Sequence, residues 1–240
     1  MGQERAGRAR MTLGVPTLSS DEKPSPVLNE LYAQYVADQD TAALISRVSQ
    51  RYTTATLERL VERGGRVSRR ASVLALGFLG SYESNAVLGR ALHDRDRGVR
   101  TFAENGIQSL WKRAGSETQC RELGIVVRLN NAQQYEDAVD TAIELLEQAP
   151  WFAEVWNQRA IALFNLGKYD ESIRDCHQAL EINPYHFGAA TGMGQCYLQI
   201  ASRERALECF RRALRLNPSL EGVRAHVVHL ERALKDHDKK

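Results

Sequence analysis

Three prolines at equal intervals constrain this chain more than any other feature of its sequence. Pro150, Pro184 and Pro218 are each 34 residues apart, and the last two close the similar strings ALEINP (179–184) and ALRLNP (213–218). A fixed period of about 20 to 50 residues is typical of stacked structural repeats. The second half should therefore be an array of equal units, each of which buries its apolar face against its neighbours.

Three units fit this period, at residues 119–152, 153–186 and 187–220. Small residues dominate three places of the unit, which indicates that two helices approach each other closely there. The eighth place holds Val126, Ala160 and Gly194, the twentieth holds Ala138, Ser172 and Ala206, and the twenty-seventh holds Leu145, Ala179 and Ala213.

The middle unit, AEVWNQRAIALFNLGKYDESIRDCHQALEINP (153–184), resembles the tetratricopeptide repeat (TPR) consensus. The resemblance rests on Trp156, Ala160, Gly167, Tyr169, Ala179 and Pro184. Gly167 stands where the first helix must stop, since glycine readily takes the left-handed conformation at a helix end. Pro184 ends the second helix, because proline cannot continue the hydrogen-bond ladder.

The flanking units depart from this consensus. Glu122 and Ala190 stand where the middle unit has Trp156, and Gln133 occupies the place of the turn glycine. Beyond them, Val223, Val227, Leu230 and Leu234 recur at helical spacing and predict a helix with one apolar face. The resemblance to TPR proteins implies that this helix caps the array.

The first half has a different period. Val67 and Ala71 recur 32 residues later as Val99 and Ala103, and the strings VSRRASVLALGFLG and LGRALHDRDRGVR resemble HEAT-like repeats. Weaker helices are expected at 26–36, 41–52 and 54–63. Residues 1–24 lack helical periodicity, so we expect a disordered tail there.

These observations predict an all-α, right-handed α-solenoid. Its parts should be a disordered tail at 1–24, HEAT-like helical repeats at 25–115, three TPR repeats within 116–220, and a capping helix with a charged tail at 221–240. The join at 114–119 is short, which favours a tight turn. We expect Trp111 before the join to stack on Leu123 and Val127 after it.

No enzymatic motif is apparent in the sequence. It contains no G-x-x-x-x-G-K-[ST] phosphate loop, no H-E-x-x-H metal helix and no G-x-S-x-G nucleophile turn. Its four cysteines form no C-x-x-C pair. His226 and His229 are three residues apart, but solvated side chains are the simpler interpretation. We therefore expect a protein that is not an enzyme and binds neither a cofactor nor a metal.

Charge and hydropathy narrow the class of partner. A net charge of +2 is too small to draw the whole chain to nucleic acid or to a membrane surface. No apolar run resembles a signal peptide or reaches the length of a membrane-spanning helix. These features predict a cytoplasmic protein without a membrane partner.

The resemblance to TPR proteins implies a concave groove, lined by the first helix of each unit, that binds a peptide or helix of another protein. The groove positions are Asn130, Asn131, Asn157, Ile161, Phe164, Asn165, Gln195 and Gln199. Amides suit a peptide main chain, and Ile161 and Phe164 suit an apolar side chain. The alternative is that the amides are merely solvated.

Chaperone-binding TPR domains carry lysine and arginine in this groove to hold a terminal carboxylate. The corresponding places here are Leu123, Val127, Asn157, Thr191 and Gln195, so the basic clamp is missing. We expect no binding of an acidic chaperone tail, because the charge-assisted hydrogen bonds would be lacking.

Two alternative functions remain open. A basic patch in the HEAT-like half, Arg63, Arg66, Arg69, Arg70, Arg95, Arg97 and Arg100, would suit the phosphates of nucleic acid. Glu62, Asp94 and Asp96 stand among these arginines, so an internal ladder of ion pairs is the simpler interpretation. The second alternative is a chaperone-like lyase, since HEAT-like lyases attach pigments to photosynthetic antenna proteins.

Overall fold

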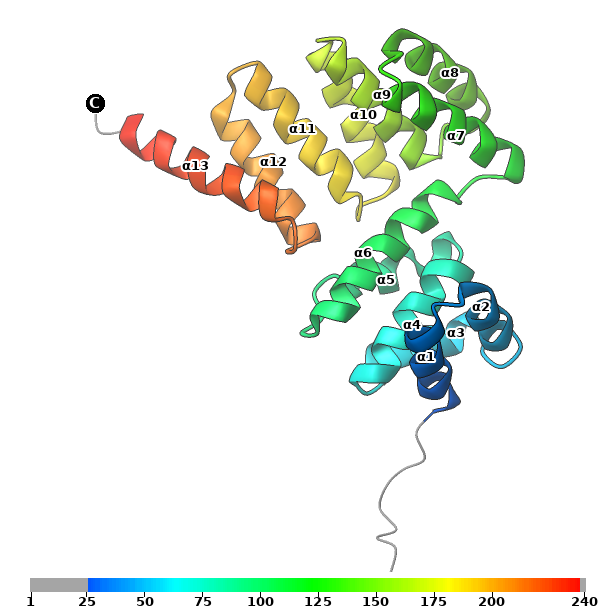
Figure 1. Cartoon of the computed structure of the whole chain (residues 1–240). Coiled ribbons are helices and arrows are strands. Elements are labelled where there is room, and N and C mark those ends of the chain that lie inside the picture. Colours follow the sequence, from blue (N-terminus) through cyan, green and yellow to red (C-terminus); the bar gives the residue numbers. More distant parts are fainter. Residues whose placement is uncertain (1–25, 238–240) are drawn as a thin grey trace, which may run out of the picture.

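A computed structural model describes residues 26–237, and every regular element within that range is helical (Figure 1). The prediction of a disordered tail at 1–24 lies outside the described residues. The first half contains α1 (Val27–Asp38), α2 (Thr41–Ser49), α3 (Thr54–Arg63), α4 (Arg66–Leu79), the short 3-10 helix η1 (Tyr82–Ser84), α5 (Asn85–Ala91) and α6 (Arg97–Lys112). The three expected weaker helices correspond to α1, α2 and α3.

The second half consists of three helical hairpins and a final helix. The hairpins are α7 (Glu117–Asn131) with α8 (Tyr135–Gln148), α9 (Ala153–Asn165) with α10 (Tyr169–Ile182), and α11 (Phe187–Gln199) with α12 (Arg203–Leu216). Each helix packs on the next along the chain, and α13 (Glu221–His237) packs on α12. The expected all-helical solenoid of consecutively packed hairpins is confirmed.

Close helix packing explains the small residues that recur with the period. Ala160, Ala179, Ala206 and Ala213 are all buried. At Gly194, an added Cβ atom would lie only 2.6 Å from the Phe210 ring. The ring therefore occupies the space that a larger residue at this place would need.

The turn between the two helices of each hairpin has the same backbone conformation in all three units. Gln133, Gly167 and Ala201 have φ angles of 61°, 76° and 57°. They are one period apart, so the left-handed turn is kept even where glycine is replaced. Side chains at such a φ angle are disfavoured, and packing of the hairpins must offset that cost in the first and third units.

Two of the units also end their second helix with the same hydrogen bond. The side-chain Oδ1 of Asn183 accepts a hydrogen bond from the Tyr185 backbone N–H (3.1 Å), and Asn217 makes the same bond with Ser219 (3.0 Å). Both asparagines are fully buried. The asparagine before each proline thus shapes the connection to the next helix.

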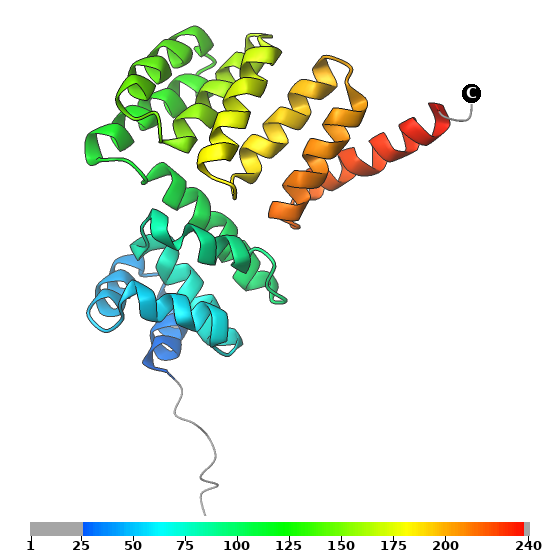
Figure 2. The same cartoon turned by 180° about the vertical axis from the view of Figure 1, so that it is seen from behind.

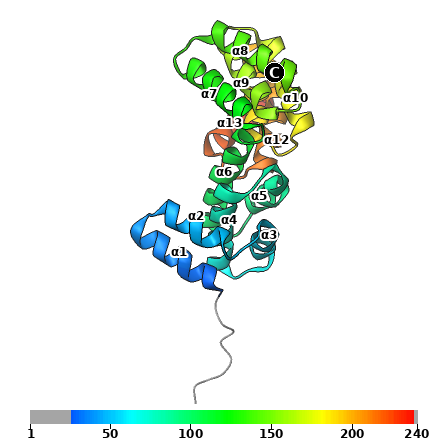
Figure 3. The same cartoon turned by 90° about the vertical axis from the view of Figure 1, so that its right-hand side faces the viewer.

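The first half lies along the ends of the repeat helices, with α6 nearest to them (Figures 2 and 3). Phe187, at the start of α11, belongs to the hydrophobic core of the first half. Tyr185 packs against that core too, and its ring fills the space beside Gly89 of α5. The contact is therefore made through the connection between the second and third hairpins.

The expected contact across the join was wrong. Trp111 stacks on His186 and lies beside Phe187. Leu123 and Val127 instead pack in a separate core with α8 and the start of α9. The physical reason is that the buried indole N–H needs an acceptor, which Asn85 of α5 provides at 2.8 Å, and this bond holds Trp111 in the core of the first half.

Candidate functional site

A cavity of about 250 Å³ opens between α9, α10 and α11. We call it the groove cavity. Its lining consists of Asn157, Ala160, Ile161, Phe164, Ser172, Cys176, Gly188, Gly192 and Gln195. Four of the predicted groove residues, Asn157, Ile161, Phe164 and Gln195, thus line one cavity.

Glycines on α11 create much of this space. Gly188 and Gly192 are four residues apart and so lie on one face of the helix. A Cβ atom at Gly192 would lie 3.4 Å from the Cys176 sulfur, at the floor of the cavity. Any larger side chain at Gly192 would fill the space between α10 and α11.

The groove cavity has no charged lining residue and no activated nucleophile. Burial raises the pKa of the Cys176 thiol, which keeps it protonated at neutral pH. The Ser172 hydroxyl donates to the Ala160 backbone oxygen (2.8 Å), and it accepts a bond from the Cys196 thiol (3.2 Å). The Ser172 hydroxyl is therefore used within the protein.

The other predicted groove residues do not line the cavity. Asn130 on α7 donates to the backbone oxygen of Gln158 (2.9 Å) and so ties the first hairpin to the second. The Asn165 amide donates to the Ile161 backbone oxygen of its own helix (2.8 Å). Asn131 and Gln199 are exposed.

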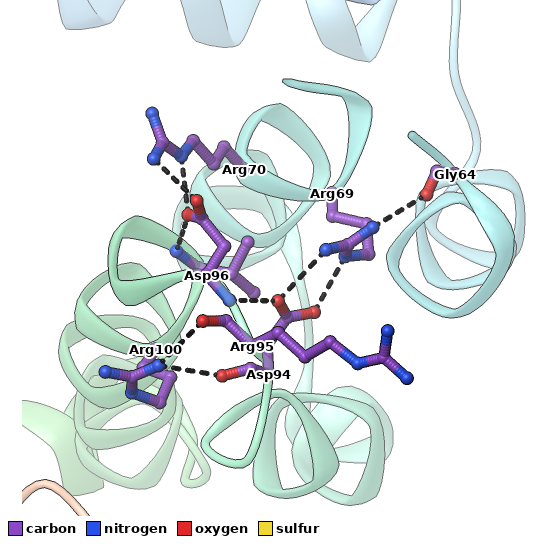
Figure 4. A network of polar contacts seen from close by, with 8 residues as sticks. Gly64, Arg69, Arg70, Asp94, Arg95, Asp96 and Arg100 are labelled. Atoms are coloured by element: carbon purple, nitrogen blue, oxygen red, sulfur yellow. Dashed lines mark hydrogen bonds and ion pairs between the residues drawn. The ribbon is translucent and has the colours of Figure 1, made fainter. Parts of the chain in front are cut away.

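Two arginines of the predicted basic patch form ion pairs with the following hairpin of the first half (Figure 4). Arg69 bonds Asp94 at 2.7 and 3.1 Å, and Arg70 bonds Asp96 at 2.6 and 2.7 Å. The hydrogen bond from Arg70 lowers the pKa of Asp96 to about 2. Their charges are thus balanced inside the protein, as the ion-pair interpretation predicts.

The remaining arginines of the patch have no side-chain ion pair with Asp94 or Asp96. Arg100 donates to the backbone oxygens of Asp94 (2.9 Å) and Arg95 (3.1 Å). Arg63, Arg66, Arg95 and Arg97 are exposed. Arg97 and Arg100 border an open crevice of about 730 Å³ whose lining also includes Glu104 and Glu221. The charge in this region is mixed.

A second, smaller cavity was not predicted. It measures about 90 Å³ and lies where the first half meets the repeats; we call it the seam pocket. Its lining consists of Tyr82, Trp111, Ala114, Trp151, Phe152, Ala153, Glu154 and Asn183. These residues come from four separate stretches of sequence. The adjacent aromatic residues Trp151 and Phe152 are therefore the one local feature of the sequence that could have indicated this pocket.

Beside the seam pocket, Glu154 and His186 form a buried pair with a contact of 3.0 Å between Oε2 and Nε2. Within the described residues, no group of three or more His, Cys, Asp or Glu side chains is suited to hold a metal ion. His226 stacks on Phe210, whereas His229 is exposed. Of the helices between residues 26 and 237, none has both the length and the apolarity needed to cross a membrane.

Comparison with known proteins gives matches in the second half of the chain. Residues 153–186 and 189–220 each match the tetratricopeptide repeat family. A TPR repeat-containing protein of Rhizobium etli is 28% identical over 130 residues, which span 52% of this chain and 62% of that protein. The Hsp70-Hsp90 organizing protein of Triticum aestivum is 26% identical over 105 residues, or 42% of this chain and 18% of that protein.

Solved structures of TPR domains are also similar. The first TPR domain of human RPAP3 has a TM-score of 0.49 and 20% identity, covering 52% of this chain and 99% of that domain. The first TPR of Spaghetti (RPAP3) bound to the HSP90 peptide SRMEEVD has a TM-score of 0.48 and 21% identity, with coverage of 50% and 96%. The aligned regions span less than two thirds of either curated relative. From the matches at 153–186 and 189–220, the second half of this chain contains tetratricopeptide repeats.

Proposed function

We propose that this chain is a protein-interaction scaffold that holds a peptide or helix of a partner protein in the concave groove of its TPR units. The observation that carries the proposal is the uncharged groove cavity between α9, α10 and α11. Ile161 and Phe164 supply apolar contact area at its wall. The amides of Asn157 and Gln195 also line it; since Gln195 Nε2 contacts His226 Nε2 (3.3 Å), its Oε1 is the atom that can accept a bond from a main-chain N–H.

Charge indicates the kind of segment that fits. On α9 the single basic residue, Arg159, bonds Asp175 through two contacts of 2.7 Å each. No charged residue occurs on α11. A segment that inserts an uncharged apolar side chain suits these helices, because a buried unpaired charge would be costly.

The names of the relatives agree with a role in protein binding. One curated relative is called an organizing protein for Hsp70 and Hsp90, and one similar structure contains an HSP90 peptide. We extend only the general role to this chain. We do not extend binding of the acidic peptide to this chain, because α9 and α11 offer no unpaired cationic group to hold it.

A peptide-display screen against the whole protein tests the proposal. We expect the selected peptides to share an internal apolar residue and to lose binding when Ile161→Ser and Phe164→Ser are combined. Gly192→Leu should have the same effect, because its side chain would fill the groove cavity.

Ile143→Ser is the matched control, because Ile143 on α8 is 40% exposed and Ile161 is 39% exposed, yet only Ile161 lines the cavity. Asn165→Ala should also leave binding unchanged, since its amide bonds its own helix. Equal loss of binding in Ile143→Ser and in the groove variants would argue against this location.

A further inference from the structure

Four aromatic side chains surround the seam pocket. Trp111 and Phe152 are buried, whereas Trp151 is 50% exposed and Tyr82 is 37% exposed. The exposed pair makes the pocket reachable from solvent. With about 90 Å³, it has room for roughly three water molecules, or for one small organic group.

A carboxylate lies in the wall of this pocket. Glu154 is only 5% exposed, and its two oxygens accept bonds from the Gln158 amide (2.7 Å) and from His186 Nε2 (3.0 Å). Burial favours the neutral acid and raises the pKa of Glu154, but the hydrogen bonds from His186 and Gln158, together with the charges of His186 and Lys112, outweigh this and hold its pKa below its usual value. The group is therefore ionised at neutral pH.

The partner imidazole is held in one orientation by two contacts. His186 Nδ1 accepts a bond from the Ala189 backbone N–H (3.0 Å), so the ring proton must be on Nε2, where it is donated to Glu154. Among the described residues, His186 is the one ion-pair partner of Glu154 within 4.0 Å. The wall of the seam pocket thus holds a buried carboxylate whose hydrogen-bond donors are His186 and Gln158.

We propose that the seam pocket binds a small organic ammonium group, of which a methylated ammonium is the simplest form. Aromatic rings attract such cations through their negative faces, and the attraction grows when the cation leaves water. The Glu154 carboxylate adds a full opposite charge at short range. Together they offset the cost of removing the cation from solvent.

A hydrogen-bond donor in the pocket wall indicates a second feature of the ligand, an oxygen atom. The Asn183 side chain is fully buried, and its Nδ2 has no hydrogen-bond partner in the described part of the chain. It can donate to an oxygen atom near the ammonium group. The equivalent Nδ2 of Asn217 also lacks a partner, so this donor alone does not define the site; the aromatic walls and the carboxylate do.

Titration of the whole protein with tetramethylammonium chloride tests the proposal, with sodium chloride at equal ionic strength as the reference. We expect saturable shifts of the Trp111 and Trp151 indole signals in NMR spectra, with a dissociation constant on the order of millimolar. The neutral tert-butanol has a similar size and should bind at least about tenfold more weakly, because it lacks the charge.

Two variants locate the binding. Trp151→Ala removes an exposed ring and should still fold, and Glu154→Gln keeps the shape but removes the charge. Each should weaken tetramethylammonium binding about tenfold or more. Ile161→Ser, in the groove cavity, should leave it unchanged, which separates this proposal from the proposed peptide groove. Absence of saturable binding, equal binding of tert-butanol, or full binding by Glu154→Gln would each overturn the proposal.

Discussion

The indole ring of Trp111 stacks on the imidazole ring of His186, with ring centroids 4.2 Å apart and planes inclined by 20°. Trp111 lies near the end of α6, and His186 lies just before α11. The indole N–H donates to Asn85 Oδ1 (2.8 Å), and the Asn85 amide donates to Asn183 Oδ1 (2.8 Å). A stack and a chain of two hydrogen bonds therefore join the two halves of the protein.

Trp111→Ala should destabilise the protein strongly, because it removes a buried ring and leaves Asn85 Oδ1 without its donor. We expect the free energy of unfolding to fall by about 3–5 kcal/mol, measured by urea denaturation. Trp151→Ala is the control: since Trp151 is half exposed, its loss should cost less than about 1 kcal/mol. Similar losses in both variants would mean that the stack does not hold the halves together.

Ala201→Gly should stabilise the protein although it removes a methyl group. Ala201 has a φ angle of 57°, where a Cβ atom is disfavoured and glycine is not. An increase of about 0.5–1 kcal/mol in the free energy of unfolding is expected from chemical denaturation. The reverse change in the second unit, Gly167→Ala, should lower it; a stabilising Gly167→Ala would show that the left-handed turn is not retained in solution.

Asp96→Asn should reduce stability in a pH-dependent way. Asp96 is the N-cap of α6 and bonds Arg70, which lowers its pKa from 3.8 to about 2. Because the folded-state pKa is the lower one, this stabilisation is present above about pH 4 and is lost as the pH falls through 2. Asparagine is also a favourable N-cap residue, so the substitution removes the carboxylate charge and keeps the helix cap.

Thermal melting of Asp96→Asn and wild type between pH 2 and pH 7 provides the measurement. The difference in melting temperature should be constant in the upper part of this range and should shrink as the pH approaches 2. A difference that does not vary with pH would assign the effect to something other than the carboxylate charge.

Arg69→Gln distinguishes internal ion pairing from nucleic-acid binding. Since Arg69 bonds both Asp94 and the Gly64 backbone oxygen, its loss should lower the free energy of unfolding by about 1–2 kcal/mol. We expect no salt-dependent gel shift of duplex DNA by wild type, and no change in the variant. A shift that weakens with salt and with Arg69→Gln would revive the nucleic-acid alternative.

The peptide SRMEEVD provides a direct test of the missing basic clamp. We expect a fluorescein-labelled form to show no saturable change in fluorescence anisotropy at micromolar protein, because α11 has no charged residue and Arg159 is paired with Asp175. The positive control is a TPR domain that binds this peptide. Saturable binding that is lost when the terminal carboxylate is amidated would contradict the prediction.

Much of the fold follows from local sequence. The left-handed turn at Gly167 and the helix end before Pro184 have local causes, and the 34-residue period carries both to the other units. The groove positions Asn157, Ile161, Phe164 and Gln195 could be predicted to share one surface because equivalent residues in stacked repeats are neighbours. The HEAT-like character of the first half, the domain boundaries and the use of the groove remain predictions.

The seam could not be predicted, because it joins residues of the first half to residues of the repeats that are far apart in the sequence. Tyr185 and Phe187 pack into the first half, whereas their equivalents one period earlier, Trp151 and Ala153, line the seam pocket. The Asn85–Asn183 bond joins residues far apart in the sequence, and no local pattern marks either of them as a partner. Such contacts depend on how two folded surfaces match in shape and polarity.

His186 lies between the seam pocket and the groove cavity. Its ring face lies against Trp111, its Nδ1 holds the first turn of α11, and the neighbouring Gly188 lines the groove cavity. If a ligand displaces Trp111 and α11 moves with it, the wall of the groove cavity changes as well. Thermodynamic reciprocity then requires a groove ligand that selects one position of α11 to change the affinity at the seam by the same factor.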